Sequence, residues 1–220
     1  MPEETYKLIV DFSIQGDLAY LSHQETLSLF QRAMIRASVP LVFSSGFNPH
    51  PYLSIPFPRS VGTQSIRDRM CVLVQFSQTP SAEDLRVSIQ QQLPADCGIL
   101  EVQCDDRKSS LHPQSVRYRF YLRTCPAGQL REHLLDCIEQ VQEKSSIEIR
   151  RYWAKKRRYK QFDMAPYLKD IALSGDQIEV LCGISQSGTV RVDEIMQWLT
   201  IEQEQLRQPV CRTEISWLQN

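Results

Sequence analysis

The sequence has no pair of cysteines at C-x-x-C spacing, although its 220 residues include seven cysteines. Zinc ribbons and cysteine-ligated clusters need such close pairs, and a disulfide framework needs an even number of cysteines. The cysteines are scattered: Cys71, Cys97, Cys104, Cys125, Cys137, Cys182 and Cys211. We therefore expect reduced, mostly buried thiols and no bound metal ion in a cytoplasmic protein.

The sequence also lacks long apolar runs. No stretch approaches the roughly 20 apolar residues that a membrane span requires. The first residues, MPEETYKLIVDF, begin acidic and pass directly into an alternating pattern. They show no basic region followed by an apolar one, as in a secretory signal. We expect a cytoplasmic location and no membrane partner.

Net charge is nearly absent as well, because 25 Lys and Arg residues against 26 Asp and Glu residues give −1. Overall charge thus gives no indication of nucleic-acid binding, but its distribution does. Residues 1–110 hold 9 basic and 12 acidic residues, whereas residues 111–220 hold 16 and 14. One stretch, RRYWAKKRRYKQ at residues 150–161, contains seven basic residues and no acidic one.

This basic stretch also contains three aromatic residues. Lys and Arg neutralise phosphates, and flat aromatic rings stack on unpaired bases. The stretch therefore predicts an RNA contact; the alternative is a solvated strand edge that its charges keep from aggregating. The candidate RNA-binding residues are Arg150, Arg151, Tyr152, Trp153, Lys155, Lys156, Arg157, Arg158, Tyr159 and Lys160.

The hydrophobic periodicity predicts two successive strand–helix–strand–strand–helix–strand units. In the first, strands are expected at 6–12, 40–45, 70–76 and 98–104, and helices at about 23–37 and 81–93. Ser22 and Glu25 have the spacing of a capping box before the first helix. In the second, strands are expected at 116–123, 147–153, 177–184 and 209–217, with helices near Leu134 and Ile195.

The predicted fold class is α+β, with two tandem ferredoxin-like (βαββαβ) halves whose antiparallel sheets carry helices on one face. Residues 1–108 form the N-terminal half with the SH and GFNPHP motifs, and residues 109–220 form the C-terminal half with the basic patch. The join is expected between residues 105 and 115, which are polar and contain a proline.

Prolines are concentrated in one segment, SSGFNPHPYLSIPFP at residues 44–58. Four prolines exclude a helix or a central strand there, and the apolar side chains argue against a solvated linker. We predict a stiff loop that Phe47 and Phe57 anchor to the core. Such a loop holds Asn48 and His50 in fixed positions, because the prolines restrict the backbone around His50.

The first helix is expected to begin at His23, where free N–H groups and the helix dipole favour an anion. The loop after the second strand returns toward the same sheet edge, so Asn48 and His50 are predicted near His23. Such a group suits acid–base chemistry, metal binding or phosphate binding. The candidate pocket is Ser22, His23, Arg32, Arg36, Ser44, Asn48 and His50, with His23 and His50 as catalytic candidates and no metal site.

Residues 16–65, from GDLAYLSH through GFNPHP to PRSVGTQS, resemble the opening signature of the radical-SAM-linked proteins, a domain family of unknown function (DUF2344). The later segments DMAPYL and CRTEISW are also similar to that family. The chain departs from the family pattern at Gln24-Glu25, at Tyr52 in place of a lysine, and at Ala165 in place of an arginine.

The resemblance implies a radical SAM enzyme as partner, since the domain is often fused to one or encoded beside it. S-adenosylmethionine, an iron–sulfur cluster and cobalamin would be that enzyme's cofactors; this chain has no C-x-x-x-C-x-x-C motif, and we expect it to bind none. Our leading interpretation is a non-catalytic RNA-binding or substrate-presenting module acting in tRNA or rRNA modification. The alternatives are a metal-independent RNA-processing or RNA-modifying enzyme using His23 and His50, and a protein-interaction scaffold without RNA.

Overall fold

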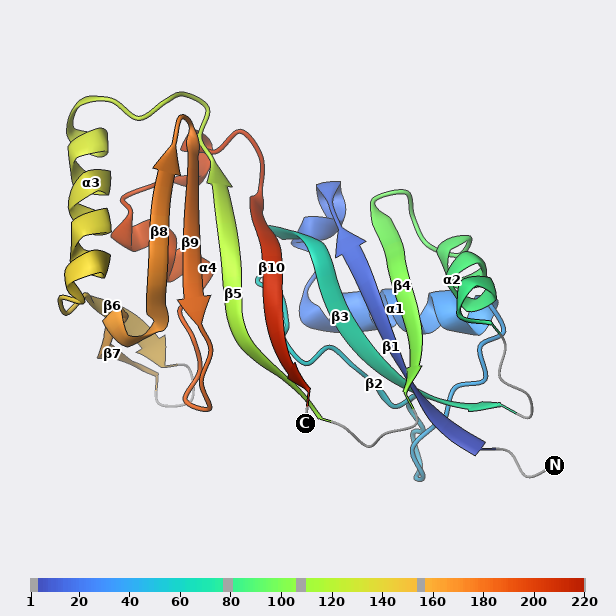
Figure 1. Cartoon of the computed structure of the whole chain (residues 1–220). Coiled ribbons are helices and arrows are strands. Elements are labelled where there is room, and N and C mark those ends of the chain that lie inside the picture. The colour runs from blue at the N-terminus through green and yellow to red at the C-terminus, as the bar shows by residue number, and fades with distance from the viewer. Residues whose placement is uncertain (1–3, 77–80, 106–109, 154–156, 220) are drawn as a thin grey trace. The chain divides into compact units, whose positions relative to one another are not determined.

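The computed structural model describes residues 4–76, 81–105, 110–153 and 157–219, and the fold is mixed α+β (Figure 1). Four α-helices and ten strands occur within these ranges, which confirms the predicted class. The chain divides into two compact units, Met1–Pro113 with Trp217–Asn220, and Gln114–Ser216. Residues 109–113 and 217–220 thus join the first unit, unlike the predicted limits of 1–108 and 109–220.

The first unit has its strands in the order β4-β1-β3-β2, and the pairs β1–β3, β1–β4 and β2–β3 are antiparallel. Its elements are β1 (Glu4–Ile14), η1 (Gly16–Tyr20), α1 (His23–Arg36), β2 (Leu53–Ser54), β3 (Thr63–Phe76), α2 (Ala82–Gln90) and β4 (Cys97–Asp105). Leu8 and Phe12 of β1 lie in one core cluster with Phe30 of α1 and Ile89 of α2. Both helices therefore cover the same face of this sheet.

Helix α1 begins as the sequence predicts. The Ser22 hydroxyl accepts the Glu25 N–H at 3.3 Å, and the Glu25 carboxylate accepts the Ser22 N–H at 2.8 Å. The capping box is confirmed, and it places His23 in the first turn.

The predicted strand at residues 40–45 forms only in part. Leu41 forms an isolated bridge to Val74, and Phe43 forms one to Pro51. Within residues 40–54, only Leu53 and Ser54 form a regular strand pair with β3. Proline has no N–H to donate to a ladder, so prolines at 40 and 51 prevent a continuous strand.

The second unit has its main strands in the order β10-β5-β9-β8, with antiparallel β5–β9 and β8–β9 pairs. Its elements are β5 (Leu111–Tyr121), α3 (Gly128–Glu143), β6 (Glu148–Trp153), β7 (Arg158–Asp163), η3 (Ala165–Tyr167), β8 (Leu168–Ser174), β9 (Gln177–Gly183), α4 (Val192–Trp198), η4 (Gln203–Gln205) and β10 (Val210–Gln219). Its buried side chains include Phe120, Leu134, Val180 and Ile195.

The prediction that residues 147–153 form an inner strand of the second sheet is wrong. These residues provide β6, which pairs only with β7 in a separate two-stranded sheet that we call the arm. Strand β8 takes the inner position beside β9 instead. Its register shifts between Leu168 and Asp170, so Lys169 is a bulge residue, and the bulge interrupts the alternation by which a strand is recognised.

Candidate functional site

The proline-rich segment forms a closed turn at its tip. The Ser44 N–H donates to the His50 carbonyl at 2.9 Å, and the His50 N–H donates to the Ser44 hydroxyl at 3.1 Å. Farther back, the Tyr52 N–H donates to the Val42 carbonyl at 3.0 Å. These bonds fix the backbone on both sides of residues 45–49.

The prediction that Phe47 anchors this loop to the core is wrong. The Phe47 side chain is fully exposed, with a relative exposure of 103%, and Asn48 is exposed too. Phe57 is half-buried. Ile55 is the residue of this segment that is buried in the core cluster. The tip is held by the hydrogen bonds between Ser44 and His50, and it presents an aromatic ring to solvent.

His50 is exposed, but its ring has a defined partner. Nδ1 lies 3.0 Å from the carbonyl oxygen of Asn48, and a carbonyl only accepts, so Nδ1 carries the proton in this contact. In the neutral ring the Nε2 lone pair is then the available acceptor. Asn48 thus orients the His50 ring through its main-chain carbonyl.

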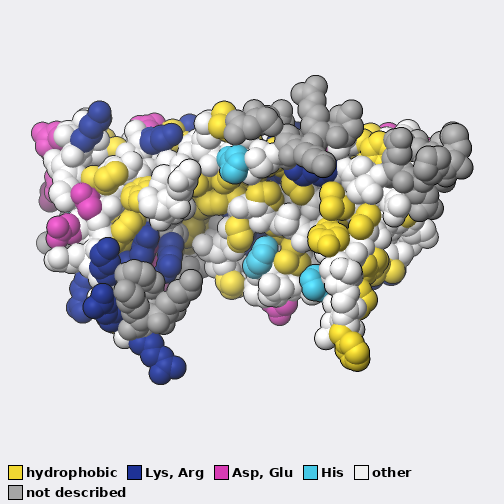
Figure 2. Space-filling model, turned by 90° about the horizontal axis from the view of Figure 1, so that it is seen from below, with side chains coloured by type: hydrophobic (Ala, Val, Ile, Leu, Met, Phe, Trp, Pro, Cys, Tyr) yellow, Lys and Arg dark blue, Asp and Glu magenta, His cyan; other side chains and the backbone are white. Residues whose placement is uncertain are grey.

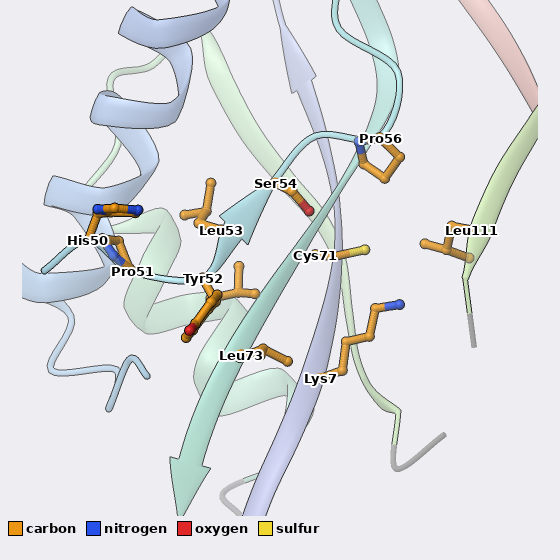
Figure 3. Close-up of a pocket in the computed structure, with 11 residues that line it drawn as sticks. Lys7, His50, Pro51, Tyr52, Leu53, Ser54, Pro56, Cys71, Leu73 and Leu111 are labelled. Atoms are coloured by element: carbon orange, nitrogen blue, oxygen red, sulfur yellow. The ribbon is translucent and has the colours of Figure 1, made fainter. Parts of the chain in front are cut away.

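The base of the loop lines a groove of about 550 Å³ in the first unit (Figure 3). The loop contributes His50, Pro51, Tyr52, Leu53, Ser54 and Pro56 to the lining, and Lys7, Cys71, Val72, Leu73 and Leu111 complete it. Figure 3 shows the Cys71 thiol pointing toward Leu111. Burial raises the pKa of that thiol, so Cys71 contributes here as a small apolar group.

His23 lines a different hollow, of about 10 Å³, together with Thr26, Ile55, Arg59 and Asp68. This volume is close to the minimum for one water molecule. Arg59 donates to the carbonyls of Ala19 and Thr63 at 3.0 and 2.7 Å, so it ties η1 to the start of β3. Since His23 and His50 line separate hollows, their convergence stays a prediction.

The predicted pocket residues Arg32 and Arg36 line neither of these hollows. Arg36 donates to the Gln92 carbonyl at 2.6 Å and so connects α1 to the end of α2. Arg32 is exposed on α1. Among the described residues, no group of three or more His, Cys, Asp or Glu has the arrangement of a metal site.

The arm has one docked face, centred on Arg151. The Arg151 guanidinium binds the buried Glu194 of α4 in bidentate fashion, at 2.5 Å from Nε to Oε1 and 2.7 Å from Nη2 to Oε2. It also donates to the Thr189 carbonyl at 3.0 Å and lies 3.4 Å above the Phe162 ring. The Arg151 guanidinium therefore has all these partners within the fold. The sequence predicted an RNA contact for this residue instead.

The opposite face of the arm is exposed. The pairs Arg150↔Gln161 and Tyr152↔Tyr159 share this face, because side chains of directly paired residues lie on the same side. The Tyr152 and Tyr159 rings have centroids 5.2 Å apart and exposures of 46% and 60%. Arg150 lies 5.0 Å from the centroid of Tyr159.

Arg157, Arg158 and Lys160 are exposed along the same arm. Figure 2 shows Lys and Arg side chains gathered over the arm. Lys155, Lys156 and the Trp153 side chain lie outside the described residues. The face of Arg150 thus combines a cation with two neighbouring aromatic rings, which is the chemistry that the basic stretch predicts. Arg158 and Lys160 pair with Trp153 and Arg151, so they alternate onto the other face of the arm.

Sequence reasoning missed Arg59 and Asp68 beside His23, and it missed Lys144 and Lys169 in the second unit. Arg59 lies in the PRSVG segment, which is part of the family signature after GFNPHP. Its position in that signature could have identified it as a candidate. No comparable pattern marks the two lysines.

The fold and site define an α+β protein with an exposed arm of cations and aromatic rings. The chain belongs to a bacterial family, described as "Uncharacterized protein conserved in bacteria (DUF2344)", whose model matches residues 7–192. This confirms the family suggested by the GFNPHP signature. No curated protein matches the chain.

A solved structure, titled "Crystal Structure of an Unknown Protein from Galdieria sulphuraria", is similar at 12% identity over 99% of each chain, with a TM-score of 0.28. In the part of the chain that the structure describes, no helix is long and apolar enough to cross a membrane.

Proposed function

We propose that the protein is a non-catalytic RNA-binding module that presents single-stranded RNA to a radical SAM enzyme in tRNA or rRNA modification. The observation that carries this proposal is the exposed cluster of Arg150, Tyr159 and Tyr152 on an arm whose other face is docked. Unpaired bases stack on such rings, and neighbouring guanidinium groups neutralise phosphates.

Docking of the arm favours binding because it reduces the conformational entropy lost when RNA is ordered on it. Arg151, Phe162 and Tyr167 form a layered contact beneath the arm: Arg151 covers Phe162, and Tyr167 stacks on Phe162 with centroids 5.3 Å apart. The strand orders β4-β1-β3-β2 and β10-β5-β9-β8 further support the proposal that each half is ferredoxin-like, an architecture common among RNA-binding domains.

The test measures binding of the full chain to a fluorescent single-stranded RNA over a range of salt concentrations. The wild type should lose affinity steeply with salt. Replacing Arg150, Arg158 and Lys160 with glutamine should lower the slope of log affinity against log salt by about 0.7 for each lost phosphate contact. Arg131→Gln, an exposed arginine on α3, is the matched control. An unchanged slope in the triple variant would identify the arm as a solvated edge.

A second role for the first unit, docking of a protein partner through the proline-rich loop, is favoured by one observation. The fully exposed Phe47 lies within residues 40–58, which contain no Lys, Arg, Asp or Glu. Such a surface suits an apolar partner better than a phosphate backbone. Association with the family's radical SAM enzyme, measured with the purified pair, tests this role.

The enzymatic alternative has less support. An acid–base pair must reach one substrate from both sides. His23 and His50 line separate hollows, and among the described residues neither hollow contains the other histidine.

A further inference from the structure

A second groove lies at the base of the arm, within the second unit. It has a volume of about 600 Å³, inside the range of small-ligand sites, which is about 300–1,000 Å³. Lys144, Lys169 and Asp163 line it together with Ser146, and Val141, Ala165, Pro166 and Leu168 provide apolar surface. Asp163 is the last residue of β7, so the arm leads directly into this groove.

Lys144 is placed there by an unusual backbone. It ends α3 in the left-handed conformation, with φ of 56° and ψ of 33°. Glycine is the residue that adopts this conformation at least cost, and a lysine there is strained. This conformation turns the chain at the end of α3, and Lys144 lines the groove there.

Lys169 is placed by a second irregularity, the bulge in β8. Its Cε would lie 2.9 Å from a Cβ built on Gly183, so the absence of a side chain at residue 183 makes room for the lysine stem. Bulges redirect side chains and are frequent beside functional sites. Neither Lys144 nor Lys169 has an ion-pair partner within the described ranges.

Asp163 is fixed by the main chain. Its Oδ1 accepts the Ile147 N–H at 2.9 Å and the Ala165 N–H at 3.0 Å. These hydrogen bonds lower the pKa of the carboxyl, so it remains an ionised acceptor at neutral pH. The groove thus offers two cations and one stationary hydrogen-bond acceptor beside an apolar surface.

We propose that this groove holds one ribonucleotide of the bound RNA strand, with its phosphate between Lys144 and Lys169 and a ribose hydroxyl donating to Asp163. The inference rests on the proposed RNA-binding function and adds to it a means of distinguishing RNA from DNA, since only RNA has the 2′-hydroxyl. The apolar side chains at Ala165 and Pro166 provide contact surface for the base.

The test titrates the full chain with uridine 5′-monophosphate, 2′-deoxyuridine 5′-monophosphate and inorganic phosphate, following the amide signals of Ser146 and Ala165 by NMR. We expect the ribonucleotide to bind most tightly. Lys144→Gly and Lys169→Gln should each weaken it about tenfold, the effect of losing one charge-assisted contact of about 1.4 kcal/mol. Asp163→Asn should remove the preference for ribose over deoxyribose.

Lys144→Gly separates binding from folding, because it removes the ammonium group and also relieves the strained backbone. It should therefore raise the denaturation midpoint while it weakens nucleotide binding. Arg131→Gln, at an exposed position on α3 outside the groove, should leave mononucleotide binding unchanged. Binding of single-stranded RNA is measured for the same variants, so failure of the groove and failure of the arm are distinguishable.

Three results would overturn the inference. One is the absence of amide shifts in the groove when RNA binds the arm normally. Another is equal affinity for ribose and deoxyribose forms. The third is inorganic phosphate binding as tightly as the nucleotide, which would show an adventitious ion only.

Discussion

Arg151 and Glu194 form a bidentate ion pair between the arm and α4, with both side chains largely buried at 19% and 5% exposure. Arg150, which directly precedes Arg151, lies on the opposite face of the arm, over the exposed ring of Tyr159. Two adjacent arginines therefore have opposite roles. One holds the arm in place, and the other is available to a ligand.

The adjacent arginines give the first prediction. Arg151→Gln should lower the free energy of unfolding by about 3 kcal/mol, because it leaves the buried Glu194 carboxylate without its cation. Arg150→Gln should change that free energy by less than about 0.5 kcal/mol and reduce the salt slope of RNA binding instead. Urea denaturation and RNA titration of both variants measure the two effects. A similar stability loss in both variants would contradict the assignment of faces.

The sequence predicts the residue types of the arm but not which of its faces is docked. The composition of residues 150–161 predicted the chemistry of the arm. Alternation within a strand separates Arg150 from Arg151, but it does not say which face is docked. That depends on Glu194, more than 40 positions away, and on a hairpin that pairs outside the main sheet.

A second prediction concerns acid stability of the first unit. Burial raises the pKa of the Asp11 carboxyl, but hydrogen bonds and charges from Arg69 and Arg67 outweigh burial and hold that pKa below its ordinary value of 3.8. Arg69 binds Asp11 at 2.6 and 2.9 Å, and its guanidinium lies 5.5 Å from the Trp217 ring centroid.

A carboxyl whose folded pKa is lowered stabilises the fold fully above its unfolded pKa. This contribution is lost as the pH falls through the lower folded value. Asp11→Asn should therefore cost about 2–3 kcal/mol at pH 7 and progressively less below pH 3.8. Denaturation curves at several pH values measure the difference. Asp17→Asn, at an exposed position, is the control for the substitution of a carboxylate by an amide.

A third prediction concerns the thiols, all seven of which are free. Burial raises the pKa of Cys97, Cys137 and Cys182 to about 12, so their thiolate forms are scarce at pH 8. Cys104 and Cys125 are exposed. A native protein treated with a chromogenic disulfide reagent should show two rapidly reacting thiols, and Cys104→Ser with Cys125→Ser should remove the fast phase. Rapid reaction of more thiols would contradict the described burial.

The first unit shows a comparable limit of prediction. The capping box that places His23, and the stiffness of the loop around His50, follow from local sequence. The outward position of Phe47 does not, because an aromatic residue in an apolar segment is expected inside. The loop closes on itself through Ser44 and His50 and turns the ring at its tip into solvent. Lys144 and Lys169 were missed for a related reason, since their placement depends on backbone irregularities that hydrophobic periodicity does not record.

The last prediction separates binding from folding in the proline-rich loop. Phe47→Ala should change the free energy of unfolding by less than about 0.5 kcal/mol, because the ring is already exposed to water. His50→Ala loses only the solvent-exposed bond to the Asn48 carbonyl, at a cost of about 1 kcal/mol or less. Arg59→Gln should cost about 3 kcal/mol, since it leaves the Ala19 and Thr63 carbonyls without a charged donor. Urea denaturation of the three variants, together with their association with the proposed radical SAM partner, tests this division. Lost association in the Phe47 and His50 variants with intact stability would support a docking loop, whereas lost stability with association retained would identify the loop as a packed lid.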